Sequence, residues 1–399
     1  MRRPAYDRRI VVRFNQIDAR KGAKRRPALR KNTIVRKSAK TAITRDALDT
    51  PAAPKRTIGV DLGDQESHYC ILDRHGDVLS EGTVRTTEGG LTRQFKKLVR
   101  ARIVIETGTH SPWVSRLLER FGHEVVIANA RQVRSIYESD RKTDKVDARV
   151  LARLGRIDKE LLHPIRHRSA QAQADLAWLR ARDALVRIRT KLINCVRGMV
   201  KSVGGRLPSA SGAYFHKKVR EYLPDSIRDA LSPLLLQIEQ LTAQINDYDK
   251  QIESMAEKKY PHTALMRQVP GVGVLTSVAF ALTIEDPNRF SKSRDIASYL
   301  GLRPRLNESG QSSPQLSITK AGDHMLRRLL VGCAQYVLGH WGPDTDLRRW
   351  GLGLMARGGK NAKKRAIVAV ARKLAVLIHA LWVSGEVYDP LRQANQAAA

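Results

Sequence analysis

The chain has 399 residues, with 72 Lys and Arg against 39 Asp and Glu, and a formal net charge of +33. This excess of cations favours a polyanionic partner, DNA or RNA, and the length predicts two to four domains. Apolar runs of about 18 residues are interrupted by charge, the start of the chain is charged rather than apolar, and the three cysteines form no zinc or disulfide pattern, so we expect a cytoplasmic protein with no membrane association.

The first 55 residues are rich in Lys and Arg and end in Pro51-Ala52-Ala53-Pro54. They contain no long apolar run, so we expect residues 1–55 to be a disordered basic arm. Such an arm could tether nucleic acid, or it could be a dispensable extension, and both interpretations stay open.

Residues 56–165 alternate strand and helix signals in the order βββαβαβα. This order is typical of an α/β domain of the RNase H or RuvC-like type, so we predict a catalytic domain of this fold. The strand signals are at 57–61, 68–73, 78–86, 103–106 and 124–128, and the helix signals are at 89–100 and 112–121.

Four carboxylates stand where a nuclease of this fold needs them. Asp61 and Glu106 each end an apolar strand signal, and open α/β sheets place their chemistry at such strand ends. Asp144 and Asp147 are three residues apart at a predicted helix start, so they share one helix face. Each acid alone could be a turn residue, a cap or a first-turn acid. Together, four hard oxygen donors in a basic chain predict a site for Mg²⁺ (or Mn²⁺) beside a phosphate.

Residues 166–261 carry heptad patterns. Apolar residues recur every seven positions from Leu179 to Val200, and they alternate steps of four and three from Leu234 to Met255. These are the a and d positions of a coiled coil, so we predict an antiparallel coiled-coil hairpin. The seam could pack within the chain or join subunits. Its length and apolar character favour a homo-oligomer, a dimer or a tetramer.

A second, mostly helical domain is predicted over residues 262–388, followed by a frayed tail at 389–399. Its last two helix signals, 326–338 and 366–383, are apolar enough to be buried, although charged residues interrupt the second.

Gly271 and Gly273 lie near the start of this domain, in a Pro-Gly-x-Gly turn. The turn resembles a helix-hairpin-helix, in which backbone N–H groups approach a phosphate at a helix N-terminus. Such turns are as often plain helix connectors, so the turn alone does not decide between the two roles.

Ser309 lies in a polar loop between Glu308 and Gly310. A serine hydroxyl is a poor nucleophile until a base or a metal ion activates it. Beside a metal-bound phosphate, Ser309 could attack and hold DNA covalently, whereas serines in such loops are more often solvated turn residues. By position, Ser312, Ser313 and Ser317 compete with it.

The motifs together resemble those of DEDD transposases of the insertion-sequence-110 family, which are bridge-RNA-guided recombinases of bacterial mobile elements. The resemblance covers about residues 56–385. In the first half it rests on Ile58-Gly59-Val60-Asp61, Ile105-Glu106-Thr107-Gly108-Thr109 and Lys142-Thr143-Asp144-Lys145-Val146-Asp147-Ala148-Arg149. In the second half it rests on Pro270-Gly271-Val272-Gly273, Gly301-Leu302-Arg303-Pro304-Arg305, Glu308-Ser309-Gly310, Thr319-Lys320-Ala321-Gly322 and Leu326-Arg327-Arg328.

The resemblance implies a RuvC-like domain, a coiled coil and a helical transposase domain in a bacterial, nucleoid-associated protein. It implies that the metal is bound by Asp61, Glu106, Asp144 and Asp147, and that Ser309 forms a 5′-phosphoserine link to DNA. It also implies composite active sites, in which one protomer's serine meets another's carboxylates, and a noncoding guide RNA that pairs with donor and target DNA. The basic arm departs from the family, whose members tend to begin close to the first strand.

We therefore interpret the chain as a site-specific DNA recombinase that acts on the ends and the target of an insertion sequence. Two alternatives stay open: a junction resolvase that uses metal-activated water, and a non-catalytic basic organiser of nucleic acid. Candidate phosphate contacts, which could instead be solvated faces, are Arg149, Arg153, Arg303, Arg305, Lys320, Arg327 and Arg328.

Overall fold

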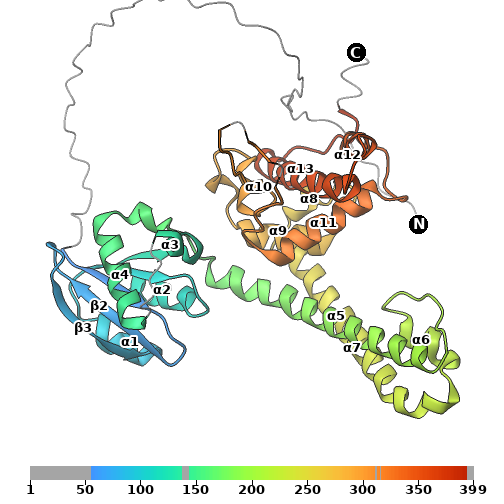
Figure 1. Cartoon of the computed structure of the whole chain (residues 1–399), viewed down its shortest axis with the longest axis horizontal. Helices are drawn as coiled ribbons and strands as arrows, with labels where there is room; N and C mark the ends of the chain where they lie inside the picture. The colour runs from blue at the N-terminus through green and yellow to red at the C-terminus, as the bar shows by residue number, and fades with distance from the viewer. Residues whose placement is uncertain (1–54, 137–142, 311, 315, 393–399) are drawn as a thin grey trace, which may run out of the picture. The chain divides into compact units, whose positions relative to one another are not determined.

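The computed structural model of the chain describes residues 55–136, 143–310, 312–314 and 316–392 (Figure 1). These residues form two compact units, which divide between Arg168 and Ser169. The first is an α/β unit and the second is helical. Nearly all of the predicted basic arm lies outside the described residues, as do Lys142 of the third acidic motif and residues 393–399 of the predicted tail.

A single mixed sheet of five strands forms the α/β unit, in the order β3-β2-β1-β4-β5. Strands β1 to β3 are antiparallel neighbours, whereas β4 and β5 run parallel to β1. All five strands lie within two residues of their predicted positions, because their apolar runs are short and bounded by turn residues. Their bounds are β1 Thr57–Asp61, β2 Glu66–Leu72, β3 Val78–Arg85, β4 Arg102–Glu106 and β5 Glu124–Ala128.

The helices of this unit are α1 Glu88–Phe95, α2 Ser111–Arg120, α3 Ala130–Ile136 and α4 Asp144–Ile157, with the short 3-10 helix η1 at Lys159–Leu162. Helix α1 ends five residues before the predicted end at Arg100. The predicted extension would have covered Leu98, which packs in part against the core without being helical, and Val99, which is 73% exposed.

Alternate residues of the strands point to opposite faces of the sheet. Ile58 and Val60 of β1 belong to one core cluster with side chains of α1 and α2, such as Phe95 and Leu118. Gly59, which lies between them, faces α4 on the other side of the sheet. This alternation decides which helix covers the side chains at the strand ends.

Gly59 lets α4 lie directly on β1. A Cβ atom at Gly59 would come within 2.0 Å of the Ala148 carbonyl oxygen and 2.4 Å of the Ala152 amide nitrogen. Further along α4, a Cβ atom at Gly155 would come within 2.3 Å of Val104 Cγ2 on β4. Two glycines, one on the strand and one on the helix, thus set the close approach of α4 to the sheet.

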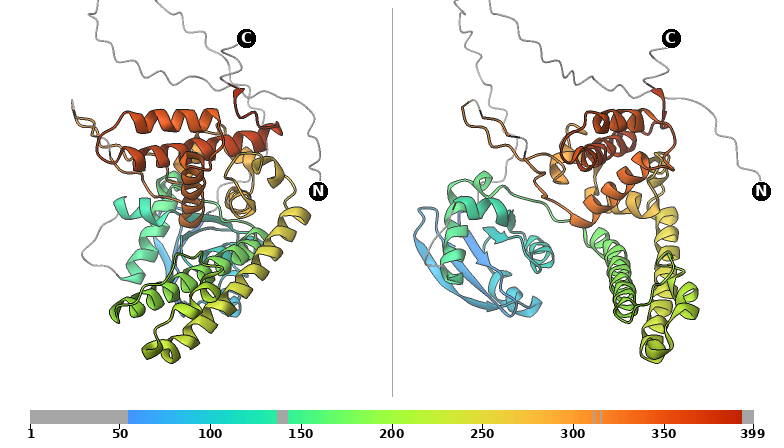
Figure 2. Two further views of the ribbon diagram at one scale, coloured as in Figure 1. Left: turned by 90° about the vertical axis from the view of Figure 1, so that its right-hand side faces the viewer. Right: turned by 45° about the vertical axis from the view of Figure 1, so that its right-hand side comes forward.

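The helical unit begins with two long antiparallel helices, α5 (Ala170–Ser202) and α7 (Asp225–Lys258), which lie side by side in Figures 1 and 2. Arg182 of α5 donates to both carboxylate oxygens of Asp249 on α7, at 2.7 and 3.0 Å. Between their far ends lie α6 (Phe215–Val219) and the 3-10 helix η2 (Arg220–Tyr222).

The apolar seam that favoured subunit association packs instead within the chain. The predicted seam residues Leu179 on α5 and Ile238, Leu241 and Ile245 on α7 are each at most 5% exposed. They are buried because α5 and α7 cover one another. An oligomer formed through these helices would have to use a different face.

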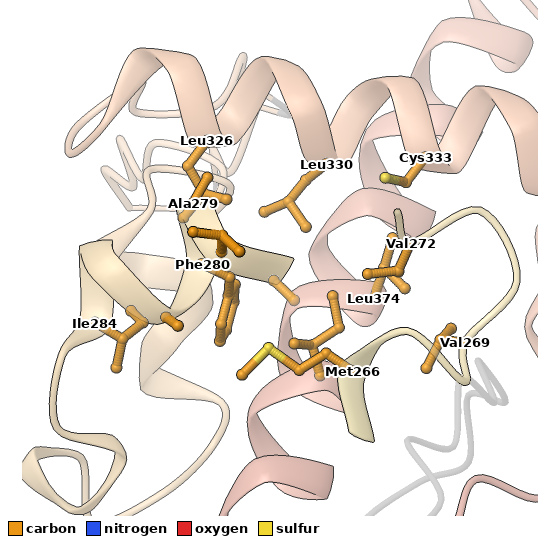
Figure 3. Close-up of a cluster of buried hydrophobic side chains, with 14 of the residues drawn as sticks. Met266, Val269, Val272, Ala279, Phe280, Ile284, Leu326, Leu330, Cys333 and Leu374 are labelled. Carbon is orange, nitrogen blue, oxygen red and sulfur yellow. The ribbon is translucent and has the colours of Figure 1, made fainter. Parts of the chain in front are cut away.

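The remaining helices of this unit are α8 Thr263–Met266, α9 Val274–Ile284, α10 Asp295–Tyr299, α11 His324–Leu338, α12 Asp346–Ala356 and α13 Ala362–Ser384, with the 3-10 helix η3 at Pro287–Arg289. They share one hydrophobic core, part of which Figure 3 shows, and this core also includes residues of α5 and α7. The two long helices and the helices after them therefore belong to one unit, which the sequence prediction divided near residue 261.

Helix α13 is the one described helix that is long and apolar enough to span a membrane. Half of its most apolar window is buried within the protein, where Val370, Leu374 and Ile378 are inaccessible to solvent. His379 is also buried, and its ring nitrogens lie 3.0 Å from Ser293 Oγ and 2.9 Å from the Pro287 carbonyl oxygen. These are the contacts of a core helix.

The end of the described chain is docked rather than frayed. The Asp346 amide at the start of α12 donates to the Pro390 carbonyl at 2.8 Å, and Arg392 is only 6% exposed. The predicted tail at 389–399 therefore includes four residues that are held against the helical unit.

Candidate active site

Asp61 and Glu106 are the last residues of two adjacent parallel strands, β1 and β4. Val60 is in register with Ile105, so the two acids that follow lie side by side. By the alternation of a strand, Asp61 shares the face of Gly59, and Glu106 shares the face of Val104. Both carboxylates therefore belong to the face that α4 covers.

Asp144 and Asp147 occupy the first turn of α4. Thr143 caps this helix, because its hydroxyl oxygen accepts from the Val146 amide. The side chain of Asp144 is 71% exposed, and Asp147 is half-buried. Gly59 brings the helix close enough for its first turn to face the strand ends. We call Asp61, Glu106, Asp144 and Asp147 the carboxylate quartet.

The quartet is electrostatically coupled at Asp61. Burial raises the pKa of the Asp61 carboxyl to about 6, and the negative charges of Asp144, Asp147 and Glu106 add to this increase in that order. His68, which is in register with Asp61 on β2, acts in the opposite direction. A carboxylate that three others disfavour is a natural place for a cation.

The donor set suits a hard divalent cation, because carboxylate oxygens are the ligands that Mg²⁺ and Mn²⁺ prefer. In the part of the chain that the structure describes, no three His, Cys, Asp or Glu side chains are gathered closely enough to hold a metal ion. The four acids thus lie within electrostatic range of one another without a closed coordination shell. Mutual repulsion opposes a closer approach without a counter-charge.

The raised pKa of Asp61 predicts a pH effect on the metal-free protein. Because the folded state binds this proton more tightly than the unfolded state, the free energy of unfolding should fall as pH rises from about 4 to about 6. Asp61→Asn removes this loss, so the variant should gain on the order of 1 kcal/mol over the parent at pH 7.5 and nothing at pH 4. Thermal melts in a chelator at both values measure it.

The matched control is Asp247→Asn, whose side chain is 73% exposed on α7. It should leave the stability of the protein unchanged at both pH values. Equal melting temperatures for Asp61→Asn and the parent at pH 7.5 would contradict the coupling of the quartet.

Several polar contacts beside the quartet were not predicted from the sequence. His68 Nδ1 lies 3.9 Å from Asp144 Oδ2. His110 Nε2 lies 3.2 Å from Asp64 Oδ1 in the loop after β1, while Trp113 Nε1 donates to His110 Nδ1 at 3.0 Å. The strand register that aligns His68 with Asp61 could have indicated the first of these. The other contacts depend on loop conformation.

Ser309 lies in the helical unit, on an exposed segment between α10 and α11. Backbone hydrogen bonds join Arg305 to Ser317 and Thr319 to Arg303 at its base. Ser309 and Ser312 exchange two backbone hydrogen bonds, 3.1 and 2.9 Å long. Backbone hydrogen bonds therefore hold the predicted polar loop at its base and around Ser309.

The competing serines of this segment have partners of their own. Ser313 Oγ donates to Glu308 at 3.1 Å, and Ser317 Oγ accepts from Arg305 Nη2 at 3.0 Å. Ser309 and Ser312 are both exposed, so exposure alone does not separate them.

The structure uses three of the predicted phosphate contacts for its own packing. Arg149 makes a two-pronged ion pair with Glu81, and Arg328 pairs with Asp183. Arg327 is 7% exposed and donates to the carbonyl oxygens of Leu300 and Ala321. For Arg327 this overturns the predicted contact, since a buried guanidinium that serves two carbonyls is not offered to DNA. Arg153, Arg303, Arg305 and Lys320 are exposed.

The two glycines of the Pro-Gly-x-Gly turn differ in their surroundings. Gly271 has φ +86°, and a Cβ there would lie 2.9 Å from the Tyr336 ring, so its role in packing against α11 is evident. Gly273 precedes the first residue of α9, and a Cβ at Gly273 would meet open space. Only Gly273 thus stays open to a phosphate at this turn.

A cationic surface that the sequence analysis did not single out lies between α12 and α13. From Leu347 to Gly385 the sequence holds nine Lys or Arg residues and no Asp or Glu. Five of them are exposed at the turn between the two helices: Arg357, Lys360, Lys363, Lys364 and Arg365. The absence of acidic residues from this stretch is the signal that could have found it.

Two family models match the chain over most of the two units. The DEDD transposase model of the IS110 family matches residues 58–204, and a transposase model of the IS116/IS110/IS902 family matches residues 263–348. The chain belongs to the IS110 family of transposases. The first match includes all four acids of the quartet, and the second includes Ser309.

Relatives of this IS110-family transposase match it over most of their length. The transposase for insertion sequence element IS1111A of Coxiella burnetii is 29% identical over 346 residues, which cover 84% of this chain and 91% of that protein. The transposase for IS1328 of Yersinia enterocolitica is 27% identical over 83% of this chain and 98% of its own. A pilin gene-inverting protein of Moraxella lacunata is 27% identical over 72% and 81%.

Membership of this family makes the chain an enzyme of DNA transposition and recombination. The excess of positive charge in the sequence agrees with a DNA substrate. The prediction of the family from the order of the motifs is confirmed.

Proposed function

We propose that this transposase cuts and rejoins DNA at the ends and target of an insertion sequence, with the carboxylate quartet as its metal site. The observation that carries the proposal is the convergence of four acids from β1, β4 and α4 on one face of the sheet, where they raise the pKa of Asp61. The name of the family model, DEDD, matches four such acids. A bound Mg²⁺ or Mn²⁺ would polarise the scissile phosphate.

In the proposed reaction, Ser309 Oγ attacks the phosphorus and loses its proton, while the bond to the 3′-oxygen breaks and that oxygen takes up a proton. DNA is then held through a 5′-phosphoserine ester. Attack of another 3′-hydroxyl reverses the step and joins strands without hydrolysis, so phosphoester energy is conserved. Ser309 is exposed on a segment that backbone hydrogen bonds hold in place, which supports access of DNA to this hydroxyl.

The DNA backbone is proposed to follow the exposed cations of the helical unit. Arg303, Arg305 and Lys320 belong to or adjoin the segment that carries Ser309, and the cationic turn between α12 and α13 extends this set. Contacts to phosphates position a duplex without reading its sequence. Sequence choice is therefore assigned to a noncoding guide RNA that pairs with donor and target DNA.

The test is a reconstituted strand-exchange reaction. Purified protein is mixed with DNA that carries the element ends and a target, a transcript of the noncoding region of the element, and Mg²⁺. We expect joined products that disappear when the metal is chelated or the transcript is omitted. Products that persist without the transcript would refute RNA guidance and leave the metal chemistry standing.

A homo-oligomer is proposed to form through the outward side of α5. Apolar residues recur along it at heptad spacing from Trp178 through Leu185 and Leu192 to Met199, and Ile188 lies between the second and the third of these. Of this set Trp178, Ile188 and Met199 are exposed, whereas Leu192 packs in part against the core. Ile188 lies nine residues after the buried Leu179, half a turn around the helix, and is 48% exposed. Such a stripe is suited to a second helix of the same periodicity.

The Ile188→Lys variant should shift the oligomer toward monomer by at least about tenfold in dissociation constant, because a charge would then lie within the stripe. Sedimentation equilibrium measures the shift. Thr190→Lys, on an exposed position beside the stripe, is the control that should leave association unchanged. Equal association of the two variants would refute this contact.

A further inference from the structure

Glu81 joins two cations of α4 in the described part of the α/β unit. Its carboxylate accepts from Arg149 Nε at 2.7 Å and from Arg149 Nη2 at 2.9 Å, and Lys145 Nζ lies 3.2 Å away. The Glu81 side chain is 14% exposed, whereas those of Arg149 and Lys145 are 35% and 63% exposed. A two-pronged pair of this kind fixes the orientation of both partners as well as their distance.

Both cations come from the first two turns of α4, among the acids of the quartet. Lys145 follows Asp144, and Arg149 follows Asp147 by two residues. Lys145 and Arg149 are four residues apart and therefore share one side of the helix, next to the side that carries the acids. Whatever holds these two cations also sets the rotation of the acidic first turn.

The strand register places Glu81 on the same face of the sheet as Asp61. Gly59 is in register with Cys70, and Cys70 is in register with Glu81, so the three form one row across β1, β2 and β3. Asp61 and His68 form the next row toward the end of β1. Glu81 thus lies on the same face of the sheet as Asp61, one row away, at the edge strand.

The rest of α4 is held by other contacts. Gly59 packs against Ala148 and Ala152, and Gly155 packs against Val104, all of which lie at or beyond the second turn. Asp144 and Asp147 precede these contacts. The Glu81 cluster joins the first two turns of α4 to the edge strand β3, and His68 of β2 approaches Asp144 at 3.9 Å.

We propose that Glu81 is a positioning residue of this transposase: by holding Lys145 and Arg149, it aims Asp144 and Asp147 at Asp61 and Glu106. The inference rests on the proposed role of the quartet as a metal site. Residues that hydrogen-bond to metal ligands commonly change metal affinity by about 10- to 100-fold when removed, and Glu81 acts on the ligands through the backbone of α4. The pKa of the Glu81 carboxyl, lowered to about 2 chiefly by its hydrogen bonds to Arg149, agrees with a pair that stays charged throughout the working pH range.

The test measures the affinity of the full chain for Mn²⁺ by calorimetry, together with thermal melts in a chelator. We expect Glu81→Gln to weaken Mn²⁺ binding by about tenfold or more while the metal-free protein stays folded with a melting temperature only a few degrees lower. The exchange variant, Glu81→Arg with Arg149→Glu, restores an ion pair between β3 and α4. It should recover most of the lost affinity, which a role in folding alone would not predict.

Glu124→Gln is the matched control. Glu124 pairs with Arg102 at 3.2 Å on the same sheet, with similar burial, at the opposite ends of the strands from the quartet. Its loss should leave Mn²⁺ affinity unchanged. Parent-like Mn²⁺ binding by Glu81→Gln overturns the inference, as does an exchange variant that folds normally but binds as weakly as Glu81→Gln.

Asp61→Asn separates this inference from the function on which it rests. If Asp61→Asn abolishes Mn²⁺ binding and Glu81→Gln does not change it, the quartet is a metal site and only the role of Glu81 fails. If Asp61→Asn binds Mn²⁺ as the parent does, the metal site itself is refuted, and the positioning role falls with it.

Discussion

Asp61→Asn should reduce strand cleavage and joining in the reconstituted reaction by at least about 1,000-fold, at any Mg²⁺ concentration that supports the parent. Asp61 is a half-buried member of the quartet whose charge the other three disfavour, so a cation beside it relieves this repulsion. Asparagine keeps the shape of the side chain and removes its charge. Denaturing gels of end-labelled DNA measure the cleaved and joined products.

DNA binding should survive this substitution. The cations that are proposed to contact phosphates lie elsewhere, so the affinity of Asp61→Asn for duplex DNA, and the steepness of its decline with salt, should match those of the parent. Asp247→Asn should retain both binding and cleavage. Cleavage by Asp61→Asn within tenfold of the parent would remove the quartet from the chemistry. A parent protein that binds DNA and never cleaves it would support the alternative of a non-catalytic organiser of nucleic acid.

Ser309→Ala should abolish the covalent link between protein and DNA. A protein–DNA adduct that survives denaturation is expected from the parent and should fall below detection, at least 100-fold, in the alanine variant, because no other atom replaces the nucleophile. Radiolabelled element-end DNA and denaturing protein gels measure the adduct. Ser309 tolerates the change structurally, since its backbone makes the hydrogen bonds to Ser312.

Ser312→Ala is the matched variant, because Ser312 is the backbone partner of Ser309 and is also exposed. It should form the adduct at the parental level. Loss of the adduct in Ser312→Ala alone would move the nucleophile to that residue. Undiminished cleavage by Ser309→Ala, with no adduct in the parent, would instead support the junction resolvase that uses metal-activated water.

The sequence could predict the elements that have a clear local pattern of apolar and capping residues. The strands of the α/β unit are short apolar runs that end at turn residues. In β1 and β4 the acidic residue that follows the apolar run, Asp61 or Glu106, marks the end of the strand. The start of α4 could also be predicted, because Thr143 is a favourable N-cap residue and acidic residues stabilise the first turn of a helix.

The sequence could not predict which helix and strand surfaces pack against one another in the folded chain. The heptad pattern identified α5 and α7, but the same pattern suits a partner helix in the same chain or in another, and here Ile238 and Ile245 are buried within the chain. Arg327 reads as a surface cation, yet its guanidinium serves two carbonyls inside the helical unit. Glu81 is separated from Arg149 by 68 residues, and only the sheet register brings them together.

The missing side chain at Gly59 has a consequence for how the active site can evolve. Because backbone atoms of β1 and α4 approach each other closely there, the distance between the strand and the body of the helix is determined by main-chain geometry. If the quartet binds its ion as proposed, any side chain added at position 59 would push α4 and its two acids away from Asp61 and Glu106. We therefore expect every variant that keeps the metal site to keep a glycine there.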